Sequence, residues 1–200
     1  MIAIIDYGMG NLGSVQKALT YLGYESCITD SRERAISATG MILPGVGAVA
    51  YAMEALRAKG MDRVVLDYIE SGRPFLGICL GMQMLFTSSE EGDGTVQGLG
   101  VLPGRVLRFS ADMGLKIPQI GWNNLTSVSD PALRKDDYVY FVHSYYCAPD
   151  RPEDIAATTR YGIEYAAAVA RDNILGTQFH PEKSGEAGLA ILNRWARRTR

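Results

Sequence analysis

One cysteine of the chain stands in a pattern that exposes a nucleophile. Cys79 is the centre of Gly77-Ile78-Cys79-Leu80-Gly81, which has the G-x-nucleophile-x-G form of a sharp turn between a strand and a helix. Glycines allow such a turn, and the apolar residues on either side predict the strand and the start of the helix. The sulfur would then lie near the positive end of a helix dipole, which favours the thiolate. A buried core cysteine is the alternative for these residues alone.

A cysteine nucleophile needs a base, and the sequence contains only His143 and His180 as histidines. In Gln178-Phe179-His180-Pro181-Glu182, the proline holds the histidine extended, so His180 and Glu182 are expected to project to the same side at a strand end. Glu182 would orient the imidazole and select the tautomer that leaves the other ring nitrogen facing the sulfur. The order predicts Cys79 as nucleophile, His180 as base and Glu182 as the orienting acid. A structural histidine beside a surface glutamate is the alternative.

Acyl transfer by such a triad also needs hydrogen-bond donors for an oxyanion. Two backbone sources are visible, the amide of Leu80 and the loop Pro44-Gly45-Val46-Gly47, hereafter the 44–47 loop. An ordinary tight turn explains this loop equally well by itself. It becomes a candidate only beside Cys79.

The bulk properties exclude several classes of protein. The chain has 200 residues, a formal net charge of -2, 47% hydrophobic and 21% charged residues, values that argue against disorder, a membrane protein and nucleic-acid binding. Its three cysteines are odd in number and lack Cys-x-x-Cys spacing, so neither a disulfide framework nor a zinc site is indicated. We therefore expect one soluble, cytoplasmic domain over residues 1–200.

Hydrophobic spacing predicts alternating strands and helices in the first half of the chain. Strands are predicted near residues 1–6, 24–29, 41–43 and 74–78, and helices near 12–22, 49–56 and 62–71. This alternation implies a single α/β domain with a mixed, largely parallel sheet flanked by helices. Short runs near 138–146, 166–170 and 174–179 predict strands that are partly antiparallel, and a last helix is predicted near 186–197.

A competing motif lies near the start of the chain. Gly8-Met9-Gly10-Asn11-Leu12-Gly13 matches G-x-G-x-x-G after a predicted strand, and Asp30 has the spacing of a ribose contact. This interpretation would make the chain a dinucleotide-binding oxidoreductase. Short glycine motifs recur by chance more often than an elbow with His-Pro-Glu, so the cysteine interpretation is favoured. A stand-alone cysteine hydrolase acting on peptides or small amides is a third class.

Two motifs carry a family resemblance. Gly77-Ile78-Cys79-Leu80-Gly81-Met82-Gln83 and Gln178-Phe179-His180-Pro181-Glu182 resemble the nucleophile and His-Glu motifs of class I (triad) glutamine amidotransferases. Five further stretches resemble the glutaminase subunits of imidazole glycerol phosphate synthase, in histidine biosynthesis: Ile5-Asp6-Tyr7-Gly8-Met9-Gly10-Asn11-Leu12, Pro44-Gly45-Val46-Gly47-Ala48, Pro118-Gln119-Ile120-Gly121-Trp122-Asn123, Phe141-Val142-His143-Ser144-Tyr145 and Glu182-Lys183-Ser184. Val49 and Ile120 depart from the family pattern, where an aromatic residue and a methionine are expected. The glutaminase subunit of another class I amidotransferase stays open.

The resemblance implies an activity, a partner and a set of site residues. It implies a class I amidotransferase-like fold in which glutamine is hydrolysed and ammonia passes to a β/α-barrel cyclase subunit, in a heterodimer that forms imidazole glycerol phosphate and an aminoimidazole carboxamide ribotide. It implies no metal or other cofactor, and it makes the residues 8–13 motif a family loop. The implied oxyanion donors are Val46, Gly47 and Leu80; the implied glutamine contacts are Gly45, Gln83, Glu91, His143, Ser144 and Tyr145; and the implied interface residues are Trp122, Asn11 and Lys183. A half-buried loop aromatic is the alternative for Trp122.

Overall fold

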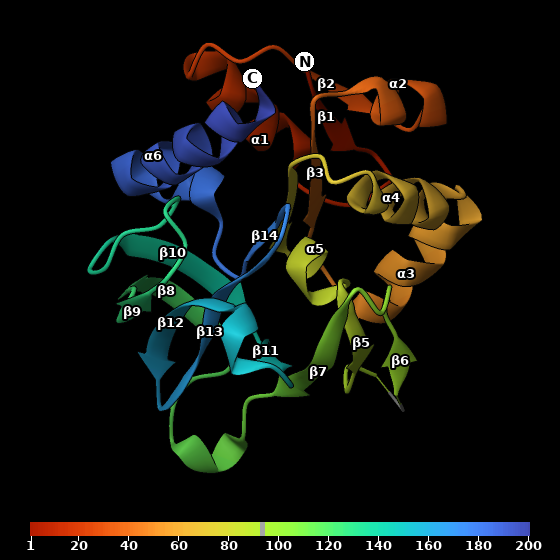
Figure 1. The fold of residues 1–200 in the computed structure, drawn as a ribbon. Coiled ribbons are helices and arrows are strands. Elements are labelled where there is room, and N and C mark those ends of the chain that lie inside the picture. Colours follow the sequence, from red (N-terminus) through yellow and green to blue (C-terminus); the bar gives the residue numbers. More distant parts are fainter. Residues whose placement is uncertain (93–94) are drawn as a thin grey trace.

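The structure is a computed structural model that describes residues 1–92 and 95–200. Its central element is a mixed sheet (Figure 1). In spatial order the sheet contains β2 (Ser26–Thr29), β1 (Ile2–Ile5), β3 (Gly40–Gly45), β4 (Phe75–Cys79), β14 (Ile174–Thr177), β13 (Ile163–Arg171), β11 (Tyr145–Pro149), β7 (Leu102–Arg108), β5 (Phe86–Ser89) and β6 (Val96–Gln97). From β2 to β14 neighbouring strands are parallel, and from β14 to β7 they are antiparallel. The predicted single α/β fold is confirmed.

The remaining strands lie beside the antiparallel half. β12 (Ile155–Tyr161) pairs with β13 and with the short β9 (Ser127–Val128). β8 (Gln119–Asn124) and β10 (Tyr138–His143) form a separate two-stranded antiparallel ribbon, hereafter the β8–β10 ribbon. This ribbon packs against β12, and Trp122 lies on its strand β8.

Helices cover the parallel strands on both faces. They are α1 (Leu12–Tyr21), α2 (Arg32–Ser37), α3 (Val49–Ala58), α4 (Met61–Glu70), α5 (Leu80–Gln83) and α6 (Gly185–Ala196), with 3-10 turns η1 (Ala111–Met113), η2 (Pro152–Asp154), η3 (Pro181–Lys183) and η4 (Arg197–Thr199). None of these helices, which are those of the described residues, is long and apolar enough to span a membrane.

The two faces of the sheet follow from the alternation of side chains along each strand. Ile2 and Ile4 pack with residues of α1 and α6, whereas Ile5 packs with residues of α2, α3 and α4. Figure 1 shows the same division, with α1 and α6 on one side of the parallel strands and α3 and α4 on the other. Both faces are therefore closed, as the nearly continuous apolar runs of these strands require.

Strand register brings the ends of three strands together. β3 pairs with β4 so that Gly45 lies opposite Cys79, and β14 pairs with β4 so that Thr177 lies opposite Ile78. Since these strands are parallel, their carboxyl ends share one edge of the sheet. That edge holds the 44–47 loop, the elbow and the segment that leads to His180.

Two predicted elements differ from those observed. The helix expected after Cys79 is a single turn, because the chain turns at Met84 and Leu85 and enters β5 at Phe86, whose side chain is buried in the core. The run near 138–146 is not one strand: β10 ends at His143, and β11 begins at Tyr145 in the other sheet. Hydrophobic periodicity continues through Ser144 and gives no sign of the change of sheet.

Two glycines give a matched test of this packing. A Cβ on Gly81 would lie 1.8 Å from the carbonyl oxygen of Leu43, whereas a Cβ on Gly13 would have no neighbour within 4 Å. Gly81→Ala should lower the free energy of unfolding by about 3 kcal/mol, since β3 and α5 must separate. Gly13→Ala should raise it by about 0.5 kcal/mol, because helix α1 loses less backbone entropy on folding. Urea unfolding of both variants checks this; equal tolerance of the two would show that the β3–α5 contact does not require glycine.

Candidate active site

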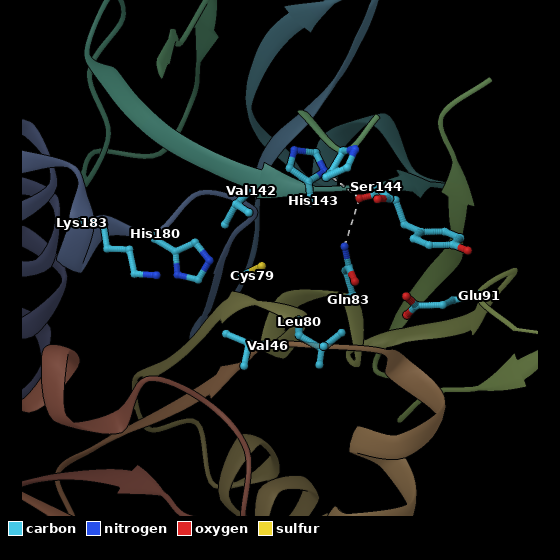
Figure 2. A pocket seen from close by; sticks show the side chains of 13 residues that line it. Val46, Cys79, Leu80, Gln83, Glu91, Val142, His143, Ser144, His180 and Lys183 are labelled. Atoms are coloured by element: carbon cyan, nitrogen blue, oxygen red, sulfur yellow. Dashed lines mark hydrogen bonds between the residues drawn. The ribbon is translucent and has the colours of Figure 1, made fainter. Parts of the chain in front are cut away.

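A cavity of about 390 Å³ opens at the shared edge of β3, β4 and β14 (Figure 2). It brings together residues from segments that are far apart in the sequence. Its lining residues are Val46, Gly47, Cys79, Leu80, Gln83, Glu91, Pro118, Val142, His143, Ser144, Tyr145, His180 and Lys183. The residues predicted for the nucleophile, the base, the oxyanion and the glutamine contacts therefore meet there, except Gly45 and Glu182, which lie directly behind the wall.

Cys79 has a backbone conformation that L-residues rarely adopt, with φ 55 and ψ -108. Such a conformation costs on the order of 1–3 kcal/mol and persists only where the surroundings impose it. Here the turn is closed by glycines: a Cβ on Gly77 would lie 2.8 Å from the carbonyl oxygen of Gly81. The elbow predicted from the sequence is present, and it directs the sulfur into the cavity.

His180 and Glu182 form a buried pair. The Nδ1 atom of His180 lies 2.8 Å from Oε1 of Glu182, and their side chains are 3% and 1% exposed. The contact arises differently from the prediction, because Glu182 lies in the 3-10 turn η3 and folds back toward the histidine instead of continuing an extended chain. Ser184 stabilises this turn by donating its hydroxyl to the carbonyl of His180 at 2.6 Å.

The carboxylate also fixes the role of the other ring nitrogen. Since Glu182 can only accept, Nδ1 of His180 donates to it, and Nε2 is left for the cavity. No described residue gives Nε2 a hydrogen bond of ordinary geometry. Figure 2 shows the imidazole of His180 and the sulfur of Cys79 pointing toward each other.

The two histidines have opposite electrostatic environments. Burial lowers the pKa of His180, but its polar contacts with Cys79 and Glu182 and the charges of both outweigh burial and raise that pKa to about 9. Burial lowers the pKa of His143 to about 4, with a further lowering by the charge of His180 and an opposing effect of the hydrogen bond to Tyr145. At neutral pH His180 is therefore a cation that favours the thiolate beside it, and His143 is neutral.

One carbonyl organises the predicted glutamine contacts. The oxygen of Tyr145 lies 2.8 Å from Nδ1 of His143 and accepts a hydrogen bond from Nε2 of Gln83 at 3.1 Å. The other ring nitrogen of His143 lies 3.1 Å from the hydroxyl of Tyr165. Both side chains are thus fixed before any ligand binds.

Glu91 also lines the cavity. Its Oε2 accepts the backbone N–H of Val49 at 2.6 Å, at the start of α3. Burial raises the pKa of Glu91, and the hydrogen bond from Val49 opposes that rise. Val49, a departure from the family pattern, is a fully buried residue at this helix start.

The 44–47 loop is held from behind by the glycine-rich segment 8–13. Tyr7, just before that segment, donates its buried hydroxyl to the carbonyl of Pro44 at 3.0 Å, and a Cβ on Gly45 would lie 2.6 Å from the same hydroxyl. Gly47, with φ 93, has Met9 against it. Tyr7 was not predicted as a site residue; its signals in the sequence are its place two residues after a buried strand and within the family stretch Ile5-Asp6-Tyr7-Gly8.

The residues of the dinucleotide motif have other contacts in the fold. Gly10 packs beside the backbone of Pro44, and Asp30 lies 3.5 Å from Nζ of Lys59. Lys59 also donates to the carbonyl of Asp6 at 3.1 Å. This segment supports the cavity wall.

The predicted interface residues lie on different elements: Trp122 is on the face of the β8–β10 ribbon that carries the lining residue Val142. Trp122 is 52% exposed on the β8–β10 ribbon and packs edge-on against Tyr140, with ring centroids 5.9 Å apart. Ile120, the second departure from the family pattern, is also exposed on β8, so it does not affect the core. Asn11 precedes α1, and Lys183 lines the cavity.

Comparison with known proteins identifies the family. Residues 3–198 match the family described as Glutamine amidotransferase class-I. The chain belongs to this family. The imidazole glycerol phosphate synthase subunit HisH of Syntrophotalea carbinolica is 51% identical over 202 residues, covering 96% of this chain and 97% of that protein. The HisH subunit of Chlorobaculum tepidum is 48% identical, covering 98% and 99%.

These relatives confirm the branch that the motifs indicated: the chain belongs to the family of HisH glutaminase subunits of imidazole glycerol phosphate synthase, in histidine biosynthesis. Solved structures agree on the fold. A crystal structure of a glutamine amidotransferase matches with a TM-score of 0.76 at 18% identity, covering 100% of this chain and 99% of that chain. The PurLQS structure from Thermotoga maritima matches with a TM-score of 0.73 at 18% identity, covering 98% and 97%. At this identity the two structures support the fold alone.

The two histidines allow a direct test of the site electrostatics. In an NMR titration of the ring protons, His180 should titrate near pH 9 and His143 near pH 4. Glu182→Gln should move the pKa of His180 downward, because a carboxylate is replaced by a neutral amide, and should leave His143 in place. A wild-type His180 that titrates near its ordinary value of about 6.5 would contradict the proposed contacts.

The same shifts predict how stability depends on pH. His180 is protonated more readily in the folded chain, so its contribution to stability is fully present below about pH 6.5 and is lost as the pH rises toward 9. His143 acts in the opposite sense: its contribution is present above about pH 6.5 and is lost as the pH falls toward 4. Urea unfolding between pH 6.5 and 9 should therefore show a smaller loss of stability in Glu182→Gln than in the wild type.

Proposed function

We propose that Cys79, His180 and Glu182 hydrolyse L-glutamine to glutamate and ammonia. The observation that carries the proposal is the buried His180–Glu182 pair, whose second ring nitrogen faces the strained Cys79 in a class I amidotransferase. This arrangement matches nucleophile, base and orienting acid in role and order. The oxidoreductase interpretation has no such support. A stand-alone cysteine hydrolase would use the same triad, and the match to class I amidotransferases favours glutamine as the substrate.

The proposed reaction uses one proton carrier in both halves. The sulfur of Cys79 attacks the side-chain amide carbon of glutamine, and the proton on Nε2 of His180 passes to the amide nitrogen, which leaves as ammonia. The resulting thioester is attacked by water, which gives one proton to Nε2 while the C–S bond breaks and the thiolate of Cys79 is restored. The second proton stays on the new carboxyl group and is lost to solvent when that group ionises to glutamate. Glu182 keeps the ring in place throughout and stabilises its charged form.

The oxyanion and the substrate backbone need separate groups. We assign the oxyanion to the backbone amide of Leu80 and to the amides of Val46 and Gly47, which line the same cavity. Both N–H groups of Gln83 are occupied by Tyr145 and by Gln178, so Gln83 offers its oxygen, an acceptor suited to the α-ammonium group of glutamine.

Further glutamine contacts complete the proposed pocket. Glu91 offers a carboxylate to the same ammonium group, and His143, Ser144 and Tyr145 line the same cavity. Gly45 shapes the base of the 44–47 loop, where a larger residue would meet Tyr7 and Leu80.

We propose that the ammonia passes to a β/α-barrel cyclase subunit in a cytoplasmic heterodimer, where imidazole glycerol phosphate and an aminoimidazole carboxamide ribotide are made. The relatives are each a subunit of imidazole glycerol phosphate synthase, which supports a partner subunit. Its position is supported by the exposed residues Ile120, Trp122 and Tyr138, which lie on the face of the β8–β10 ribbon that carries Val142. Val142 and the exposed Val46 line the cavity. Trp122 would be the anchor of this surface, with Asn11 and Lys183 at its rim.

Cys79→Ala and Cys79→Ser should abolish glutaminase activity of the complex without unfolding the chain, because neither supplies a thiolate. Cys147→Ser and Cys27→Ser are the matched controls and should retain activity, although Cys147 is buried and its replacement should cost stability. A glutamine-derived electrophile should label Cys79 alone among the cysteines. Activity at the wild-type rate in either Cys79 variant would refute the triad.

Trp122→Ala should weaken association with the barrel subunit by about 2 kcal/mol or more, the usual scale of an interface anchor. Tyr51→Ala is the control, since Tyr51 is also an exposed aromatic residue, 71% accessible, but lies on α3. Calorimetric titration measures both. Equal affinities for the two variants, or a large loss of thermal stability in Trp122→Ala alone, would return Trp122 to a structural role.

The isolated chain should be nearly inactive, and the partner with its ligand should activate it through the 44–47 loop. Glycine exchanges peptide orientations at low steric cost, and loss of one oxyanion donor lowers turnover by about 100-fold to 1,000-fold. Gly47→Pro removes an amide and cannot adopt φ 93, so it should block activation. The test measures glutaminase turnover of the wild type and of Gly47→Pro, with and without the partner and its ligand. Full activity of the isolated wild-type chain would contradict activation by the partner.

A further inference from the structure

The nucleophile has a polar neighbour that the triad does not use. Gln178 is fully buried, and its Nε2 lies 3.7 Å from the sulfur of Cys79. Strand register explains the contact. Thr177, the last residue of β14, pairs with Ile78 of β4, so the residues that follow them, Gln178 and Cys79, lie side by side. Gln178 and His180 are two residues apart in extended chain, on either side of Phe179, which points into the core.

A backbone carbonyl determines which end of the Gln178 carboxamide faces the sulfur. The oxygen of Tyr145 can only accept, so the end of Gln83 that contacts it must be Nε2. The same nitrogen donates to Gln178 at 3.0 Å, so that end of Gln178 must be Oε1. The remaining end of Gln178 is therefore Nε2, and it presents an N–H to Cys79.

We propose that Gln178 is a second hydrogen-bond donor to the sulfur of Cys79 and stabilises its negative charge. The proposal rests on the proposed function of Cys79 as the nucleophile. A hydrogen bond to a charged acceptor is roughly twice as strong as a neutral one. Unlike His180, Gln178 gives no proton away during the reaction, so its contribution is present at every stage in which the sulfur is charged.

The test measures the rate of alkylation of Cys79 by iodoacetamide as a function of pH, in the full chain, by mass analysis of the Cys79 peptide. Gln178→Met removes the donor with little change of volume, and Gln178→Glu keeps the acceptor for Gln83 but places an oxygen against the sulfur. Gln178→Met should move the midpoint of the pH profile upward by about one unit, which is a tenfold loss of alkylation rate below the midpoint. Gln178→Glu should move it further, because two negative groups meet.

Thr177→Val is the matched control. Thr177 is buried on the same strand and donates to the carbonyl of Phe179 at 3.1 Å, but it does not touch the sulfur. Its loss should lower stability and leave the alkylation midpoint unchanged. A role of Gln178 in packing alone predicts this same outcome for Gln178→Met, so an unchanged midpoint in a folded Gln178→Met would overturn the proposal.

The unmutated chain decides the matter if neither Gln178 variant folds. The side-chain amide resonance of Gln178 should shift with pH at the alkylation midpoint, and that shift should vanish in Cys79→Ser. A chemical shift of the Gln178 amide that does not change when the sulfur of Cys79 ionises would overturn the proposal. Alkylation does not depend on glutamine hydrolysis, so an active Cys79→Ser variant would refute the triad while leaving this contact measurable.

Discussion

The strained backbone at Cys79 is the constraint on which the site depends. A residue held at φ 55 needs surroundings that leave it no alternative, and β3, β4 and α5 provide them by approaching closer than any side chain would allow. The close contact between Gly81 and the carbonyl of Leu43 fixes the elbow to β3, and β3 leads directly into the 44–47 loop. Cys79 and the 44–47 loop are therefore placed by one piece of packing.

Electrostatics then separate the polar groups by role. Both histidines line the cavity, yet the contacts of His180 with Cys79 and Glu182 raise its pKa to about 9, whereas burial lowers the pKa of His143 to about 4. The carbonyl of Tyr145 has a comparable effect on the amides, since it orients Gln83 and through it Gln178. Groups that can only accept thus determine which way the adjustable side chains face.

Most residues of the proposed site could be named from the sequence because they lie in short local motifs. The elbow and the His-Pro-Glu segment each contain their own geometry within a few residues, so Cys79, His180 and Glu182 needed no knowledge of the fold. Tyr7 and Gln178 could not be found in this way, because their roles arise from strand register between segments that are distant in the chain. The change of sheet after His143 was missed for a related reason: local hydrophobicity does not encode the partner of a strand.

The placement of the two tryptophans makes the chain its own optical reporter. Trp195 is fully buried in α6, whereas Trp122 is half exposed on β8. An indole in the core emits at shorter wavelength than one in contact with water, so the fluorescence of the native chain is the sum of two separable bands. Quenching by iodide in solution would reach only the exposed ring. Substitution of Trp122 by phenylalanine would leave a signal from the interior alone, and the difference between the two chains would report what covers the outer surface.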